Sequence, residues 1–241
     1  MTDPKAILFD LDDTLIAAYG DPQAAWGEVA AEFSDELHPA RDELVEAILA
    51  TGAIYWADAE RSRRGRLDIL DARRKIVAQA FNQLGLPTRA VLQDDLIDRM
   101  VVRFGQYRDE RMHLFEDTHA VLDEVRERGV RLGLVTNGAG VAQRAKLDRF
   151  DLARRFDHIQ IEGEAGYGKP DRRAFTATLT ALDARPDEAW MVGDNFDADI
   201  VEAHRLGLTT HWVNPTARRL PGQTQPSRTV SRLSEILTAL R

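Results

Sequence analysis

The sequence has no cysteine among its 241 residues, which excludes disulfide bonds, thiolate metal sites and a cysteine nucleophile. It has no apolar run near the ~20 residues that a membrane helix needs. The N-terminal "MTDPK" lacks the basic start and the apolar stretch of a signal peptide. The six histidines show no spacing typical of metal ligands. These absences predict a cytoplasmic protein without thiolate or histidine metal chemistry.

The chain also has fewer basic residues, 32 Lys and Arg, than acidic residues, 40 Asp and Glu. The formal net charge of −8 argues against nucleic acid or a membrane surface as a partner, so an anionic ligand has to be held by local groups. With 44% apolar and 30% charged residues, the composition is that of an ordinary globular protein. Whether it is a monomer or a homodimer stays open.

Short apolar runs alternate with longer stretches of helical period, which is typical of β-α units. The pattern predicts an α/β fold, a Rossmann-like parallel sheet with helices on both faces. Strands are expected at 6–9, 131–135, 158–161, 189–192 and 210–213. A helix is expected to run from a cap at Asp117 to Arg128. Further helices are expected at 140–153, 171–182, 197–206 and within "SRLSEILTAL". The stretch 214–228 is expected to be a loop.

The interval between the first two strands is unusually long. More than a hundred residues separate Asp10 from Thr136, whereas later strands recur roughly every thirty. Residues 16–111 contain helical patterns and no convincing strand. We therefore expect a helical cap domain at 16–111, inserted into an α/β core formed by 1–15 and 112–241.

The stretch "ILFDLDDTLI" at 7–16 places Asp10, Asp12 and Asp13 directly after an apolar strand. Carboxylates this close repel one another unless a cation or a fixed donor lies among them. We interpret Asp13 as a turn residue. Asp12 comes two positions after Asp10, and an extended segment places both on the same side.

Other polar residues follow the later strands. Parallel sheets bind ligands at the carboxyl ends of their strands, so these side chains are expected to meet Asp10 and Asp12 at one edge. They are Thr136, Asn137, Lys169 and Asp194. The carboxylates of Asp10, Asp12 and Asp194 suit Mg²⁺, which prefers oxygen ligands, while the Thr136 hydroxyl, the Asn137 amide and the Lys169 ammonium suit anionic oxygens.

Four short motifs occur in a fixed order along the chain. They are "DLDDT" at 10–14, "VTN" at 135–137, "GKPD" at 168–171 and "GDNFDAD" at 193–199. In order and spacing they resemble the motifs of the haloacid dehalogenase superfamily, and the resemblance covers essentially the whole chain. It implies Asp10 as nucleophile, Asp12 as general acid and base, Thr136 and Lys169 as phosphate-holding groups, and Asp194 as metal ligand. Asp199 would support the metal site from outside the ligand set.

The expected activity is Mg²⁺-dependent hydrolysis of a small phosphorylated metabolite through an aspartyl-phosphate, since a carboxylate nucleophile divides one hard hydrolysis into two easier steps. In the family's dehalogenases the position of Asp12 is not acidic, which favours a phosphatase. A phosphomutase, a 2-haloacid dehalogenase and, in another class, a phospho-accepting signalling receiver remain alternatives. The substrate itself stays open.

The expected cap contains four arginines close together, Arg61, Arg63, Arg64 and Arg66. Such a run is usually a solvated helix face. The alternative is that one or two of them bind an anionic part of the substrate.

Overall fold

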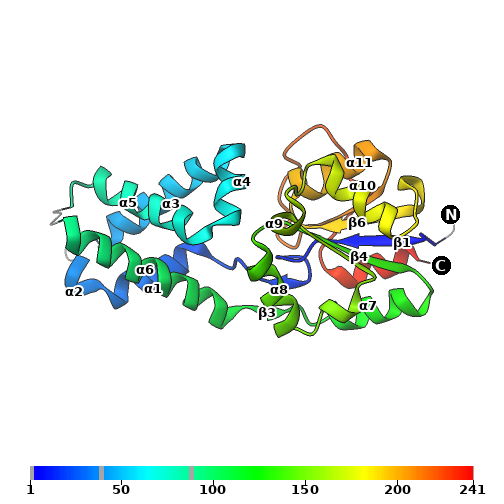
Figure 1. Ribbon diagram of the computed structural model, residues 1–241, viewed down its shortest axis with the longest axis horizontal. Coiled ribbons are helices and arrows are strands. Elements are labelled where there is room, and N and C mark those ends of the chain that lie inside the picture. Colours follow the sequence, from blue (N-terminus) through cyan, green and yellow to red (C-terminus); the bar gives the residue numbers. More distant parts are fainter. Residues whose placement is uncertain (1–2, 38–40, 87–89, 241) are drawn as a thin grey trace. The chain divides into compact units, whose positions relative to one another are not determined.

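The computed structural model describes residues 3–37, 41–86 and 90–240 of the chain. It divides into two compact units (Figure 1). The first, the core unit, runs up to Ala17 and resumes at His113, and the second, the helical unit, runs from Ala18 to Met112.

The core unit is built on a six-stranded sheet in the order β5-β4-β1-β6-β7-β8, with every neighbouring pair parallel. The predicted α/β class with a parallel sheet is therefore confirmed. The strands are β1 (Ala6–Phe9), β4 (Arg131–Thr136), β5 (His158–Ile161), β6 (Ala189–Gly193), β7 (Thr209–Val213) and β8 (Arg228–Val230). A separate antiparallel pair, β2 (Ile16–Ala17) and β3 (His113–Leu114), lies where the chain leaves and re-enters this unit.

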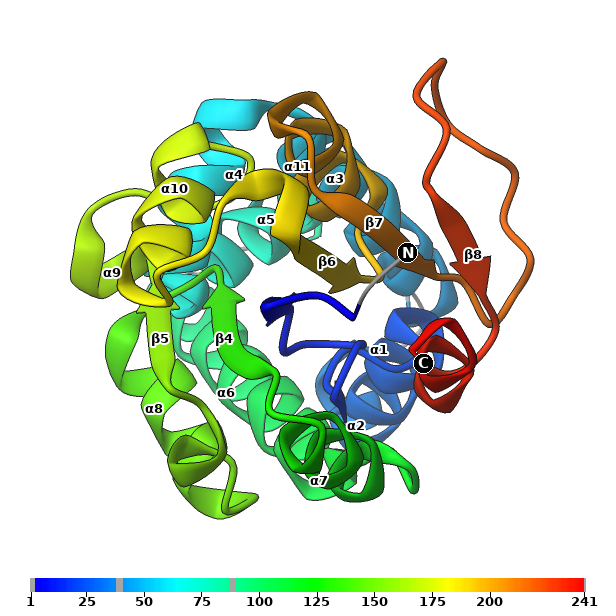
Figure 2. The same ribbon diagram turned by 90° about the vertical axis from the view of Figure 1, so that its right-hand side faces the viewer.

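Helices cover both faces of the sheet, with α10 and α11 on one face and α7 and the C-terminal helix on the other (Figure 2). Leu8 and Met191 point to the first face and pack against Phe175 of α10 and Ala203 of α11. The helices of the core unit are α7 (Thr118–Glu127), α8 (Gly140–Arg149), α9 (Glu162–Ala165), α10 (Arg172–Ala181) and α11 (Glu202–Leu206). Shorter helical turns are η1 (Ala153–Arg155), η2 (Pro186–Glu188), η3 (Phe196–Val201) and η4 (Leu233–Ala239).

The structure differs from the expectation near the C-terminus. The stretch expected as a loop at 214–228 ends in β8, an edge strand that pairs with β7. The last helix is a 3-10 helix, η4, rather than an α-helix. Asp117 precedes α7 but makes no capping bond to it, because its carboxylate accepts a hydrogen bond from the Ser234 amide at 2.8 Å instead. A tertiary contact has replaced the local one.

The helical unit consists of helices alone in the described residues from Ala18 to Met112. Three of these helices begin after a capping aspartate, Asp21, Asp58 or Asp68, whose carboxylate accepts main-chain N–H groups that have no partner within the helix. The helices are α1 (Pro22–Glu32), α2 (Ser34–Leu37), α3 (Arg41–Ala57), α4 (Ala59–Leu67), α5 (Ile69–Gln83) and α6 (Ala90–Arg111). They enclose an apolar core made of this unit's own residues, and burial of that core stabilises the unit. Among the residues described in either unit, no helix has both the length and the apolar character that crossing a membrane requires.

Candidate active site

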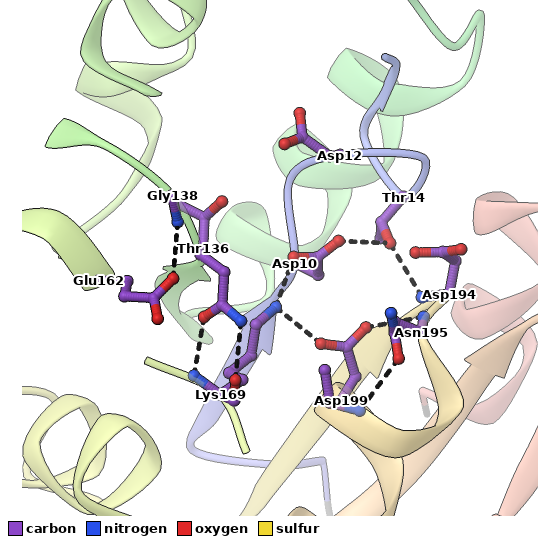
Figure 3. Close-up of polar contacts among 12 residues, drawn as sticks. Asp10, Asp12, Thr14, Thr136, Gly138, Glu162, Lys169, Asp194, Asn195 and Asp199 are labelled. Atoms are coloured by element: carbon purple, nitrogen blue, oxygen red, sulfur yellow. Dashed lines mark hydrogen bonds and ion pairs between the residues drawn. The ribbon is translucent and has the colours of Figure 1, made fainter. Parts of the chain in front are cut away.

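The carboxyl ends of the central strands of the core unit bring together polar side chains that are far apart in the sequence (Figure 3). Asp10 follows β1, Thr136 ends β4, and Asp194 follows β6. Since β1 lies between β4 and β6, these three positions are neighbours at one edge of the sheet. Lys169 reaches the same place from the segment after α9.

Lys169 is the cation at the centre of this group. Its side chain is only 2% exposed, and its ammonium is ion-paired with Asp10 and, at 2.7 Å, with Asp199. Burial alone would lower the pKa of Lys169, but the two carboxylates outweigh that effect and raise it above the usual value. Lys169 therefore stays charged.

Asn137 holds the Lys169 main chain in place. Its carbonyl oxygen accepts a hydrogen bond from the Lys169 amide at 2.7 Å, and its amide nitrogen donates to the Lys169 carbonyl, also at 2.7 Å. Gly168 allows this close approach, because a Cβ there would collide with the Asn137 oxygen. Asn137, predicted as a phosphate ligand, thus uses both side-chain groups to position Lys169.

Asp10 is buried and linked to Asp194 through Thr14. The Thr14 hydroxyl donates to the Asp10 carboxylate at 3.2 Å and accepts from the Asp194 amide at 3.1 Å. Burial raises the pKa of Asp10, as do the nearby charges of Asp199 and Asp194, while Lys169 opposes the shift. Burial, followed by the charges of Asp199 and Asp13, raises the pKa of Asp194 to about 7. The Lys169 ammonium and the Arg218 guanidinium, which lies 3.5 Å from the Asp194 carboxylate, do not balance the three carboxylates of Asp10, Asp194 and Asp199.

Asp10, Asp194 and Asp199 offer carboxylate oxygens that all lie within 4.8 Å of one another. The donor set is all oxygen and carries an uncompensated negative charge, which fits Mg²⁺. Both Asp199 oxygens already have partners, since one faces Lys169 and the other accepts from the Asn195 amide at 2.9 Å. Asp199 is also fully buried, whereas Asp10 is 7% exposed and the Asp194 side chain 20% exposed, so Asp10 and Asp194 are the carboxylates better able to hold a cation.

Asp199 approaches the sheet closely because of Gly193 at the end of β6. A Cβ at that position would collide with the Asp199 carboxylate, so only glycine leaves room for it. Asp199 is fully buried in η3, whose first turn is capped by the Asn195 side chain bonding to the Ala198 amide at 3.1 Å. Asp199 thus contacts Lys169 and the loop after β6, while its support of a metal site stays a prediction.

The structure does not bring the Asp12 carboxylate into the group around Lys169 (Figure 3). Both Asp12 oxygens instead accept from the Lys146 ammonium at 2.8 Å, and one also accepts from the Gln143 amide at 3.2 Å. The same Gln143 amide donates to the Thr136 hydroxyl oxygen, so the hydroxyl proton of Thr136 is directed elsewhere. Asp12 and Thr136 are thereby held by two residues of one helix, α8.

Four residues of this region were not singled out by the sequence. Thr14 lies within the "DLDDT" motif, four positions after Asp10, and that spacing was the available signal. Gln143 and Lys146 look like solvated residues of a helix, so the sequence carries no signal that marks them as site residues. Glu162 is buried, and its carboxylate accepts from the Gly138 amide at 3.0 Å, which fixes the loop after β4.

The arginine run of the helical unit is largely engaged with neighbours in the sequence. Arg63 and Arg64 both bond to Glu60, at 3.3 and 2.7 Å. The Arg61 Nε atom lies 3.5 Å from a carboxylate oxygen of Asp58, and the Arg66 guanidinium donates to the Ser62 hydroxyl at 3.0 Å. These contacts are those of a charged helix surface.

Comparison with known proteins places the chain in a family. The family model of haloacid dehalogenase-like hydrolases matches residues 4–207. The chain is 32% identical to a phosphoserine phosphatase of Thermus thermophilus, with 98% of each chain covered. It is 28% identical to a glyceraldehyde 3-phosphate phosphatase of Methanopyrus kandleri, covering 86% of this chain and 82% of the relative.

Solved structures agree on the fold. A haloacid dehalogenase-type hydrolase of Bacillus subtilis, YfnB, which was solved with magnesium bound, superposes with a TM-score of 0.73 at 20% identity over 99% of both chains. The L-2-haloacid dehalogenase of Xanthobacter autotrophicus superposes with a TM-score of 0.63 at 18% identity, covering 98% of this chain and 97% of that one. At such identities the superpositions show the shared fold alone.

Proposed function

The chain belongs to the haloacid dehalogenase-like hydrolases, and we propose that it is a Mg²⁺-dependent phosphatase that hydrolyses a small phosphorylated metabolite through an aspartyl-phosphate. One observation carries the proposal. A buried lysine, Lys169, is paired with Asp10 and Asp199 beside a third carboxylate, Asp194, at the carboxyl edge of a parallel sheet. In this proposal Asp10 is the nucleophile, Lys169 holds the anionic oxygens, and Asp10 with Asp194 holds the metal ion.

In the first step the Asp10 carboxylate attacks the phosphorus atom and the bond from phosphorus to the ester oxygen breaks. Asp12, the proposed general acid, gives a proton to that leaving oxygen. The Lys169 ammonium and the Thr136 hydroxyl, which can donate its proton, hold the non-bridging oxygens, on which charge accumulates. Mg²⁺, when held by Asp10 and Asp194, would neutralise further charge on these oxygens.

In the second step water attacks the phosphorus of the aspartyl-phosphate, and the Asp10 carboxylate leaves unchanged. Asp12, now without its proton, takes one from the attacking water. Asp12 therefore has to exchange its contact with Lys146 for one with the substrate, while Asn137 acts through Lys169. We propose that the helical unit serves as the cap that selects the substrate.

A phosphate-release screen tests the function. Phosphoserine, glyceraldehyde 3-phosphate, nucleotides and p-nitrophenyl phosphate would be assayed with Mg²⁺ and again with excess chelator. We expect release that needs Mg²⁺. Absence of turnover across such a panel would favour the receiver alternative, because a receiver accepts phosphate without releasing it repeatedly.

Magnesium is expected to stabilise the wild-type core unit through Asp194. At about a hundred times its dissociation constant, Mg²⁺ adds about 2.7 kcal/mol, or about 5 to 10 °C in Tm for a chain of this size. Asp194→Asn should remove most of that shift and raise the Tm of the metal-free protein, because a half-buried carboxylate repelled by Asp199 is gone, and the lost ion pair with Arg218 offsets this only partly. Thermal unfolding with and without Mg²⁺ measures both effects. An unchanged Mg²⁺ shift in the variant would exclude Asp194 as a ligand.

Lys146 is expected to affect catalysis through Asp12. In Lys146→Met the Asp12 carboxylate keeps only the longer Gln143 bond of those described above, so it is oriented less well. We expect single-turnover release of the alcohol from alkyl phosphates to slow about tenfold, since small misplacements of a reacting group are costly. Single-turnover release of p-nitrophenolate, a leaving group that needs no proton, should slow much less. Lys146→Arg should restore most of the loss, and equal losses on both substrates would contradict the positioning role.

A further inference from the structure

A second cation, Arg218, lies beside the carboxylates of the core unit. It belongs to the segment that joins β7 to β8. The Nη2 atom of Arg218 is 3.5 Å from an Asp194 carboxylate oxygen. The same nitrogen donates to the Asp194 main-chain carbonyl at 2.9 Å. Because this hydrogen bond is made to the main chain, it holds the guanidinium next to Asp194 whatever the carboxylate itself binds.

The loop around Arg218 is built so that it holds this residue in place. The buried Asn214 side chain binds the Arg218 main chain twice, since its oxygen accepts from the amide and its nitrogen donates to the carbonyl, each at 2.9 Å. Ala217, the residue before Arg218, has a φ of 52°, a left-handed conformation that alanine rarely adopts. The main chain from which the half-exposed Arg218 side chain extends is therefore fixed.

Trp212 of β7 holds the same carbonyl group of Asp194. The indole Nε1 of Trp212 donates to this carbonyl at 2.9 Å. Its ring is buried and packs edge-on against the Phe196 ring, with 5.2 Å between the ring centres. The Asp194 main chain thus has a second donor that does not depend on Arg218. Removal of the Arg218 guanidinium should therefore leave Asp194 in its place.

The charge of Arg218 acts directly on the Asp194 carboxylate. Burial and then the charges of Asp199 and Asp13 raise the pKa of Asp194. The guanidinium of Arg218 opposes that shift, and it does so more strongly than Lys169. The same guanidinium repels a cation that binds to Asp194, because like charges a few ångströms apart repel one another even where water screens them partly.

We infer that Arg218 weakens the binding of Mg²⁺ by the carboxylates of Asp10 and Asp194, because it fixes a positive charge beside one of them. The inference rests on the proposed function, in which these two carboxylates hold the metal ion. Arg218 then belongs to the metal site without being a ligand of the metal ion. If Arg218 served only to orient the Asp194 carboxylate, its removal would have the opposite effect and weaken Mg²⁺ binding.

Calorimetric titration of the metal-free protein with Mg²⁺ tests this role, with the Mg²⁺-dependent shift in Tm as a second measure of binding. Arg218→Gln and Arg218→Met remove the charge, whereas Arg218→Lys keeps it. The matched control is Arg219→Gln, which changes the next residue of the same loop. Arg219 is exposed and forms no ion pair within residues 3–37, 41–86 and 90–240.

We expect the dissociation constant for Mg²⁺ to fall about tenfold in Arg218→Gln and Arg218→Met, as the loss of one partly screened like charge implies. Arg218→Lys and Arg219→Gln should stay within about twofold of wild type, since the first keeps the charge and the second removes an exposed one that salt screens. The gain in Arg218→Gln should shrink at high ionic strength.

The remaining outcomes each decide the question. Weaker Mg²⁺ binding in Arg218→Gln, or an affinity equal to that of wild type, would overturn the inference. Binding by Arg218→Gln where wild type shows none would support it. If wild type releases phosphate only with Mg²⁺ while the Arg218 variants bind Mg²⁺ as wild type does, the proposed function stands and only this inference fails. If neither wild type nor any variant binds Mg²⁺, the metal site of the proposed function fails, and this inference fails with it.

Discussion

Replacing Asp10 with Asn is expected to lower kcat by at least about a thousandfold on every phosphate ester that the wild-type protein hydrolyses. The amide keeps the shape of the side chain and can still accept from Thr14, so the fold should be retained. It cannot form the acyl phosphate, and it removes one of the two carboxylates best able to hold Mg²⁺. Steady-state phosphate release, together with a Tm near that of wild type, measures the effect.

Asp13 provides the matched control for Asp10. It is an acidic neighbour in the same turn, has a φ of 60° and lies outside the carboxylate group of Asp10, Asp194 and Asp199. Asp13→Asn should keep turnover within a few-fold of wild type. Asp10→Asn with as much as a tenth of wild-type turnover would remove Asp10 from the nucleophile role.

Replacing Asp12 with Ala is expected to cut turnover of alkyl phosphates by about a hundredfold or more, the usual contribution of a positioned general acid. An alkoxide leaving group needs a proton, whereas p-nitrophenolate leaves without one. The loss with p-nitrophenyl phosphate should therefore be smaller in the step that forms the aspartyl-phosphate. The measurement is single-turnover release of the alcohol from each ester.

The Asp12 result also separates the enzyme alternatives. A dehalogenase expels halide, which needs no proton, so Asp12 would have no such task there. Asp12→Asn keeps the shape and should behave like Asp12→Ala if the proton is what matters. Equal single-turnover losses on alkyl and p-nitrophenyl esters would make the role of Asp12 structural or metal-related.

The sheet and its carboxyl edge were predictable because buried parallel strands appear as short continuous apolar runs. Each such run ends at a defined residue, so Asp10, Thr136 and Asp194 were expected together and lie there. The short strand β8 was missed, because three residues that include a charged Arg228 carry no apolar signal. Its pairing with β7 is a tertiary effect.

The partners of the site residues could not be predicted from sequence. Lys146 is 134 positions away from Asp12, and a lysine on a helix looks like any solvated residue. Asn137 was expected to face a ligand, yet its amide is used by the Lys169 main chain.

The most direct test of the account is the first turnover of Asp12→Ala with p-nitrophenyl phosphate. Here the aspartyl-phosphate should form readily and hydrolyse slowly, since the activated leaving group needs no acid but the attacking water still needs a base. We expect a burst of p-nitrophenolate of about one equivalent per site. We also expect a phosphoryl group on the Asp10 peptide that hydroxylamine removes, and loss of both signals when Asp10→Asn is added. Release of p-nitrophenolate and phosphate in step from the first turnover, with no phosphorylated protein, would contradict it.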